Sequence, residues 1–235
     1  MLISKSKKFI FLHIPKTAGS SMRDALGDYA DFDTTFAHAP VEVGLAYYQQ
    51  SKDTLKHVAR MNFDLLGTYP PELGAGNHIT QEYLKNSGLW LEDLTGYFEF
   101  TIVRNPLDRV VSMYNHRNKD KSCGPNFLRF AKRVKMNYQG NFDLNNFYRP
   151  QTAWITHPLT DKVHIFKFED LAESVEPLEM ALGFKLDFPH VNRNRMKTIS
   201  SVADLSDEEV EYCLDFLEQE YNDLGYDITK DRRNA

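Results

Sequence analysis

The sequence predicts an α/β fold with a central, mostly parallel sheet flanked by helices. Residues 8–14 (KFIFLHI), 97–103 (YFEFTIV) and 163–168 (VHIFKF) are short, largely apolar and rich in aromatic or β-branched residues, which is typical of buried parallel strands. A helical pattern of apolar residues follows each of these segments. Because strands that alternate with helices form parallel sheets, these three strand–helix units predict the fold class.

The first two helices start soon after their strands. The first is predicted to begin with Ser20 at or near its N-cap, because Met22 and Leu26 then lie on one face. The second is predicted to begin at Pro106, whose fixed φ suits a first helical position. Each strand therefore leads through a tight connection into a helix.

Two further helices are predicted in the C-terminal half. One lies around residues 177–182, and the clearest covers residues 206–224, where Ser206 and Glu209 can form a capping box. The buried stripe predicted for this last helix consists of Val210, Leu214, Leu217 and Tyr221. Its expected role is packing. The chain shows no convincing linker, so residues 1–235 are predicted to form a single domain.

Composition excludes several classes of protein. The chain has 235 residues and a formal net charge of −5, which disfavours a general nucleic-acid binder. Its two cysteines form no zinc-binding or disulfide pattern. The N-terminal apolar run is too short for a signal peptide, and no segment is long enough to span a membrane. We therefore expect a cytoplasmic protein.

Residues 13–21 (HIPKTAGSS) have the chemistry that phosphate binding requires. Small residues let backbone N–H groups turn inward, a helix N-terminus adds positive potential, and a lysine adds a full charge. The residues expected to contact an anion are Lys16, Thr17, Ala18, Gly19, Ser20 and Ser21. This is not a standard Walker A loop, because its opening glycine is absent and Lys16 precedes Gly19. An ordinary strand-to-helix turn with a solvated lysine is the alternative.

The HIPKTAGSS segment resembles the 5′-phosphosulfate-binding loop of sulfotransferases that use 3′-phosphoadenylyl sulfate (PAPS), in the branch of the heparan sulfate and other carbohydrate O-sulfotransferases. Residues 101–114 (TIVRNPLDRVVSMY) resemble the 3′-phosphate-binding strand and helix of this family, in which an arginine and a serine eight positions later contact the phosphate. Arg104 and Ser112 have this spacing, a little over two helical turns. Taken alone, Arg109 and Ser112 would be solvated helix residues.

The resemblance covers residues 8–197 and implies a P-loop-like sheet of the sulfotransferase type. It also implies that His78, within GAGNHIT, is the catalytic base. A lone histidine is often structural, so this reading stays open. His13 is the main rival, although within a buried strand it is expected to pack or to form a hydrogen bond. His38, His57 and His116 also stay open.

A late loop closes over the nucleotide in related sulfotransferases, and Asn192 and Arg193 are its natural counterparts here. A solvated basic turn is the alternative for these residues. In the function that the resemblance implies, a sulfuryl group moves from PAPS to a hydroxyl of a carbohydrate or other alcohol, and PAP is released. Lys16 would stabilise charge on the leaving group. No catalytic metal is expected, because the donor has a single 5′-phosphate as leaving group.

Aromatic and basic residues that could line a sugar site come largely from the weakly patterned regions of the chain, where substrate contacts are expected. They are Tyr47, Tyr48, Arg117, Lys119, Lys121, Arg129, Lys132, Arg133, Lys135, Tyr138, Tyr148, Arg149 and Trp154. A solvated helix face explains the basic cluster almost as well. Two other functions stay open: a P-loop kinase of a nucleotide or small metabolite, and a non-catalytic nucleotide-binding module. The acceptor and the oligomeric state are undetermined by the sequence.

Overall fold

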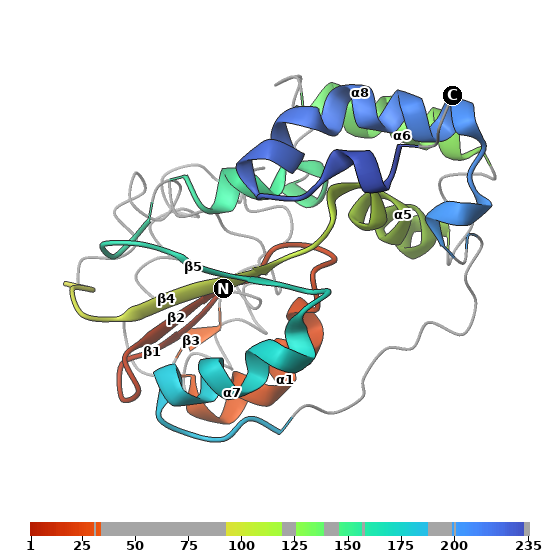
Figure 1. Ribbon diagram of the computed structural model, residues 1–235. Helices are drawn as coiled ribbons and strands as arrows, with labels where there is room; N and C mark the ends of the chain where they lie inside the picture. Colours follow the sequence, from red (N-terminus) through yellow and green to blue (C-terminus); the bar gives the residue numbers. More distant parts are fainter. Residues whose placement is uncertain are drawn as a thin grey trace, which may run out of the picture.

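The computed structural model describes residues 1–30, 32–33, 93–118, 126–138, 146–156, 158–187, 199 and 201–232. Within these segments the strands form one five-stranded sheet in the order β3-β1-β2-β4-β5 (Figure 1). The strands are β1 (Leu2–Ser4), β2 (Phe9–Leu12), β3 (Phe32–Asp33), β4 (Phe98–Val103) and β5 (His164–Lys167).

The three predicted strands are confirmed as β2, β4 and β5, and they pair in parallel as expected. Two strands that the sequence did not predict, β1 and β3, extend the sheet on the β2 side, and both of their pairings are antiparallel. The sheet is therefore mixed and not mostly parallel. Strand β1 escaped prediction because a three-residue strand has too few residues for a periodic pattern.

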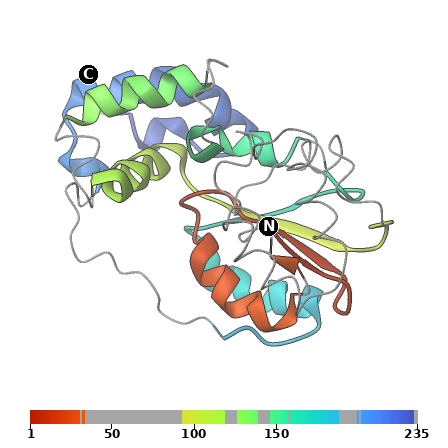
Figure 2. The ribbon, with the colours of Figure 1, turned by 180° about the vertical axis from the view of Figure 1, so that it is seen from behind.

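The helices divide into two groups. Their bounds are α1 (Gly19–Leu26), α5 (Pro106–Arg117), α6 (Phe127–Tyr138), α7 (Leu171–Leu182) and α8 (Asp207–Asp223). Short 3₁₀ helices cover Gly27–Tyr29, Asn146–Tyr148, Gln151–Trp154, Val202–Asp204 and Ile228–Lys230. Helices α1 and α7 cover one face of the sheet, whereas α5, α6 and α8 pack together beyond the carboxyl end of β4 (Figures 1 and 2).

Helix starts agree with the sequence at two positions and differ at a third. Pro106 is the first residue of α5, and Ser206 caps α8 in a capping box with Glu209. Ser20, expected at or near the N-cap of α1, lies near the N-cap and not at it. The N-cap of α1 is Ala18, in a left-handed conformation and without a side-chain hydrogen bond, and Ser20 lies within the first turn.

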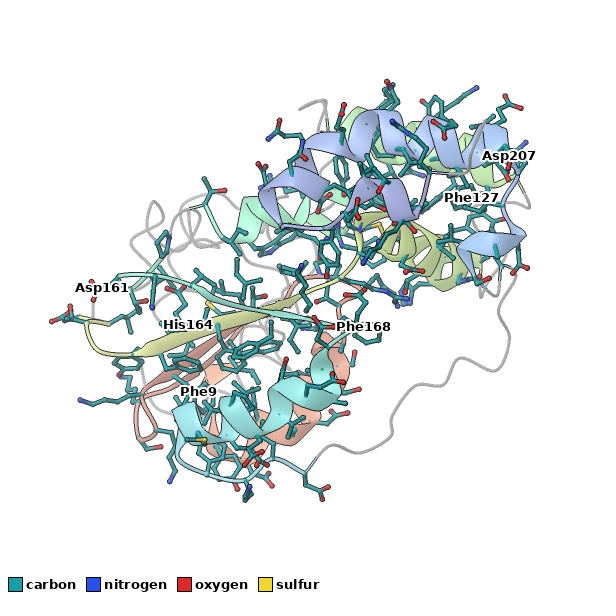
Figure 3. All side chains as sticks on the ribbon, viewed as in Figure 1. Phe9, Phe127, Asp161, His164, Phe168 and Asp207 are labelled. Carbon is teal, nitrogen blue, oxygen red and sulfur yellow. The ribbon has the colours of Figure 1, made fainter. Side chains whose placement is uncertain are left out.

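Among the described residues, the core has two main parts and a small junction. One part lies between the sheet and the α1/α7 layer and includes Phe9, which is labelled in Figure 3. The Phe100 ring packs against the rings of Phe9 and Phe11 there. The other lies among α5, α6 and α8 and includes the four residues of the stripe predicted for α8. Ile14, Val103, Trp154 and Leu224 form a third cluster that joins the sheet to the helical part. The phosphate-binding segments predicted from the sequence adjoin this junction. The single domain over residues 1–235 stays a prediction.

Candidate functional site

Both predicted phosphate-binding segments leave the sheet at the same edge. Strands β2 and β4 are parallel neighbours, and their last paired residues are Leu12 and Thr101. The Thr101 hydroxyl donates to the Leu12 carbonyl oxygen at 2.8 Å. The connection to α1 and the connection to α5 therefore begin side by side at the carboxyl ends of the strands, where open α/β sheets bind their ligands.

The 13–18 loop, which connects β2 to α1, holds an unusual backbone. Lys16 and Ala18 have φ angles of 69° and 71°, in the left-handed region that non-glycine residues rarely adopt. The Thr17 side chain is buried, and its hydroxyl donates to the Ile14 carbonyl oxygen at 3.0 Å. A hydroxyl has one proton to donate, so the Thr17 side chain stabilises the loop from within. Backbone strain of this kind, about 1–3 kcal/mol per residue, is typical of functional sites.

Gly19 is required at the start of α1 because a side chain would not fit there. A Cβ atom at this position would lie 1.8 Å from Cδ2 of His13. The His13 ring is 8% exposed and stacks on Phe11, with 6.1 Å between ring centroids. The buried His13 ring therefore packs between the loop and α1 and sets the distance between them.

The N-terminus of α1 has no side-chain cap. Its first intrahelical hydrogen bond runs from the Met22 N–H to the Ala18 carbonyl oxygen at 3.1 Å. The N–H groups at the start of a helix carry partial positive charge and attract anions. Half-buried Lys16 precedes this turn by three residues. The 13–18 loop and the first turn of α1 thus have the donors and charge that a phosphate group needs.

Arg104 lies just beyond the end of β4, and its backbone is held on both sides. Its N–H donates to Gln151 Oε1, and its carbonyl oxygen accepts from Gln151 Nε2, both at 2.8 Å. The guanidinium lies 4.7 Å from the centre of the Phe168 ring, at the end of β5 (Figure 3). Burial lowers the pKa of Arg104, and the charges of Asp108 and Glu169 oppose this shift.

The Nε atom of Arg104 is buried and has no hydrogen-bond partner among the described residues. A buried donor on a charged group is costly to leave unsatisfied, so this atom fits an anionic ligand. Ser112, the other residue expected at the 3′-phosphate, is half-buried two turns along α5. The structure thus places Arg104 at the strand end and Ser112 on the helix that follows, as the spacing predicted.

Arg109 is a residue whose role the sequence misjudged. It was expected to be solvated, but it is completely buried. Its Nε donates to the Pro15 carbonyl oxygen at 2.9 Å, so α5 is bonded directly to the 13–18 loop. Its position three residues before Ser112 places both on the same side of α5. A charged residue between Asp108 and Val110 gives no sign of such burial in the sequence.

Several predicted site residues lie outside the described residues: the base candidates His38, His57 and His78, the late-loop residues Asn192 and Arg193, and the acceptor candidates Tyr47, Tyr48, Lys119 and Lys121. Among the described acceptor candidates, Trp154 and Tyr148 were wrong expectations, because they are 0% and 3% exposed and belong to the buried core. Arg117 and Arg133 lie 5.4 Å and 5.6 Å from the centre of the Tyr148 ring. His116 is exposed beside Phe147.

The described residues contain no group of three or more His, Cys, Asp and Glu side chains that could hold a metal ion. In the same part of the chain, no helix has the length and apolar character needed to cross a membrane.

Comparison with known proteins gives the family. No significant match was found among curated proteins or among solved structures. A family model described as the sulfotransferase family matches residues 1–227, which is nearly the whole chain and includes both strand ends described above. The chain therefore belongs to the sulfotransferase family, whose members transfer a sulfuryl group to an acceptor.

Proposed function

We propose that the protein transfers a sulfuryl group from PAPS to a hydroxyl of a carbohydrate or another alcohol and releases PAP. One observation carries this proposal: Arg109 bonds α5 to the Pro15 carbonyl, at the edge where β2 and β4 end together. A nucleotide with phosphates at both ends of its ribose is a ligand that could contact both segments at once. PAPS, when bound, supplies the sulfuryl group and a 5′-phosphate leaving group.

The 13–18 loop and the first turn of α1 would hold the 5′-phosphate. The donors are the backbone N–H groups of residues 17–21 with the hydroxyls of Ser20 and Ser21. Lys16 would add a full positive charge where negative charge develops on the leaving oxygen, and such stabilisation is often the largest contribution to catalysis. The left-handed backbone at Lys16 and Ala18 supports this role, because alternating backbone conformations direct successive N–H groups to one point.

Arg104 and Ser112 would hold the 3′-phosphate and so select a bisphosphate over ordinary nucleotides. The buried, unpaired Nε of Arg104 supports this role, because a phosphate oxygen would supply the missing acceptor. Asn192 and Arg193 would close over the nucleotide, which rests on the family resemblance alone.

His78 would take the proton of the acceptor hydroxyl. Neutral imidazole is suited to this step near neutral pH. The preference for a carbohydrate rests on the resemblance to the carbohydrate O-sulfotransferases. The cytoplasmic location stays a prediction from the sequence.

The direct test is transfer of labelled sulfate from PAPS to a panel of glycans and small alcohols. A sulfated glycan supports the whole proposal. If only a small alcohol is sulfated, the acceptor is not a carbohydrate. Binding of PAP without any product would favour the non-catalytic module. Tighter binding of ATP with Mg²⁺ than of PAP would favour the kinase, a function that the family match does not support.

A further inference from the structure

A buried polar network connects the two proposed phosphate sites through helix α8. Its central residue is Glu220, which is 3% exposed on a helix that the sequence assigned to packing. Glu220 Oε1 accepts from the Gln151 backbone N–H at 2.7 Å and lies 4.0 Å from Nη1 of Arg109. Gln151 and Arg109 are both 0% exposed.

From Glu220 the network extends to each site by one residue. On one side, Arg109 donates through Nε to the Pro15 carbonyl of the 13–18 loop. On the other side, the Gln151 side chain bonds both the N–H and the carbonyl of Arg104. The Glu220 carboxylate thus lies between Arg109, which contacts the 13–18 loop, and Gln151, which contacts the Arg104 backbone.

Two further bonds complete the surroundings of Arg109. Its Nη1 donates to the Tyr138 hydroxyl at 3.2 Å, and its Nη2 donates to the Arg149 carbonyl oxygen at 3.0 Å. A buried guanidinium with this many directed bonds has one available geometry. Replacing both members of a buried ion pair by well-packed hydrophobic residues often costs no stability, whereas removing one member leaves a buried unpaired charge and is strongly destabilising. The presence of the Arg109–Glu220 pair therefore calls for a reason other than stability.

We infer that Glu220, Arg109 and Gln151 are positioning residues that fix the separation between the 5′-phosphate and 3′-phosphate sites. This inference rests on the proposed binding of a bisphosphate nucleotide. None of the three residues needs to touch the nucleotide. A fixed separation favours a ligand that carries both phosphates at once, because the two sites are then preorganised for it. A ligand with one phosphate gains nothing from this arrangement.

The test compares three nucleotides by calorimetry: PAP, adenosine 5′-monophosphate and adenosine 3′-monophosphate. Glu220→Gln keeps the shape and the acceptor for Gln151 but removes the charge beside Arg109. We expect it to lower PAP affinity by about tenfold or more, since small misplacements are costly. The affinity for either monophosphate should change by less than about twofold. The KM for PAPS should rise accordingly.

Glu218→Gln is the matched control, because Glu218 is exposed on the same helix and should leave all three affinities unchanged. Gln151→Met leaves the Arg109–Glu220 pair in place and should reproduce the selective loss of PAP affinity if Glu220→Gln does not fold.

Equal weakening of all three ligands, or no weakening in either variant, would overturn the inference. Failure of the unaltered protein to bind PAP would instead overturn the proposed function, and the two failures are thus distinguishable.

Discussion

The two proposed phosphate sites are built in different ways. The proposed site in the 13–18 loop is formed mainly by the backbone. Two of its residues have positive φ, and α1 starts at Gly19, where the His13 ring leaves no room for a side chain. The segment from Arg104 to Ser112 is a regular strand end and helix that presents side chains. The loop site should therefore be sensitive to added volume, and the Arg104 site to the loss of one charged group.

The helix starts show the same contrast. Asn105 caps α5 by accepting from the Asp108 N–H at 3.1 Å, and Ser206 caps α8. Helix α1 has no side-chain cap. A cap satisfies the N–H groups that would otherwise bind an anion. Caps therefore stabilise α5 and α8, whereas α1 starts without a side-chain cap at the proposed 5′-phosphate site.

The largest expected effect lies outside both phosphate sites. His78→Ala should lower kcat by about 10²–10⁴-fold, because a positioned base contributes that much. PAP affinity should stay unchanged, since neither phosphate site is altered. Steady-state turnover and PAP calorimetry on the same preparation measure the two quantities. Retained turnover would show that another residue is the base.

The next effect tests the loop site by adding volume. Gly19→Ala places a Cβ 1.8 Å from the His13 ring, so α1 or the ring must move. We expect PAP affinity to fall by about 100-fold, as misplacement by an ångström can cause, and the free energy of unfolding to fall by about 1–3 kcal/mol.

Gly27→Ala is the control for this substitution. Gly27 lies at the other end of α1 with φ −56° and open space around its Cβ direction. Its substitution should change PAP affinity little. Normal PAP binding by Gly19→Ala would contradict the steric account of the loop.

The Arg104 site is tested by removing charge. Arg104→Ala should lower PAP affinity by about 10–100-fold, because hydrogen bonds to charged groups contribute about 1.5–3 kcal/mol. Ser112→Ala should have a smaller effect, about 2–10-fold. Affinity for adenosine 5′-monophosphate should not change in either variant. Arg129→Ala, which removes an exposed charge from α6, is the control, and loss of 5′-monophosphate binding in Arg104→Ala would contradict the assignment.

The smallest effect on binding is expected at a capped helix. Ser206→Ala removes the side chain that accepts from the Glu209 N–H at 3.3 Å. Urea unfolding should show a loss of about 0.5–2 kcal/mol in the free energy of unfolding. PAP affinity should be unchanged, because this cap serves stability alone. A change in affinity would mean that the start of α8 influences the nucleotide site.

Much of this molecule follows from local sequence. Short apolar runs identified the three parallel strands, a proline identified the start of α5, and Ser206 with Glu209 identified the start of α8. These features depend on residues near one another in the chain, and their physical causes are local. The two phosphate-binding segments were recognisable for the same reason, since each is a continuous motif. The matched family agrees with that recognition.

Tertiary structure decided which polar residues are buried and what they hold. Nothing local in the sequence indicates that Arg109 bonds to the Pro15 carbonyl or that Gln151 bonds to the Arg104 backbone. The position of Glu220 between Arg109 and Gln151 is equally absent from the local pattern. In the sequence, Gln151 lies 47 positions from Arg104, and Arg109 lies 94 positions from Pro15. Glu220 and Arg109 lie on different helices, α8 and α5. Long-range contacts of this kind form only when the sheet and the helical part pack together. The sequence determined the two motifs proposed to bind phosphate, and the packing between distant segments determined how they are held together.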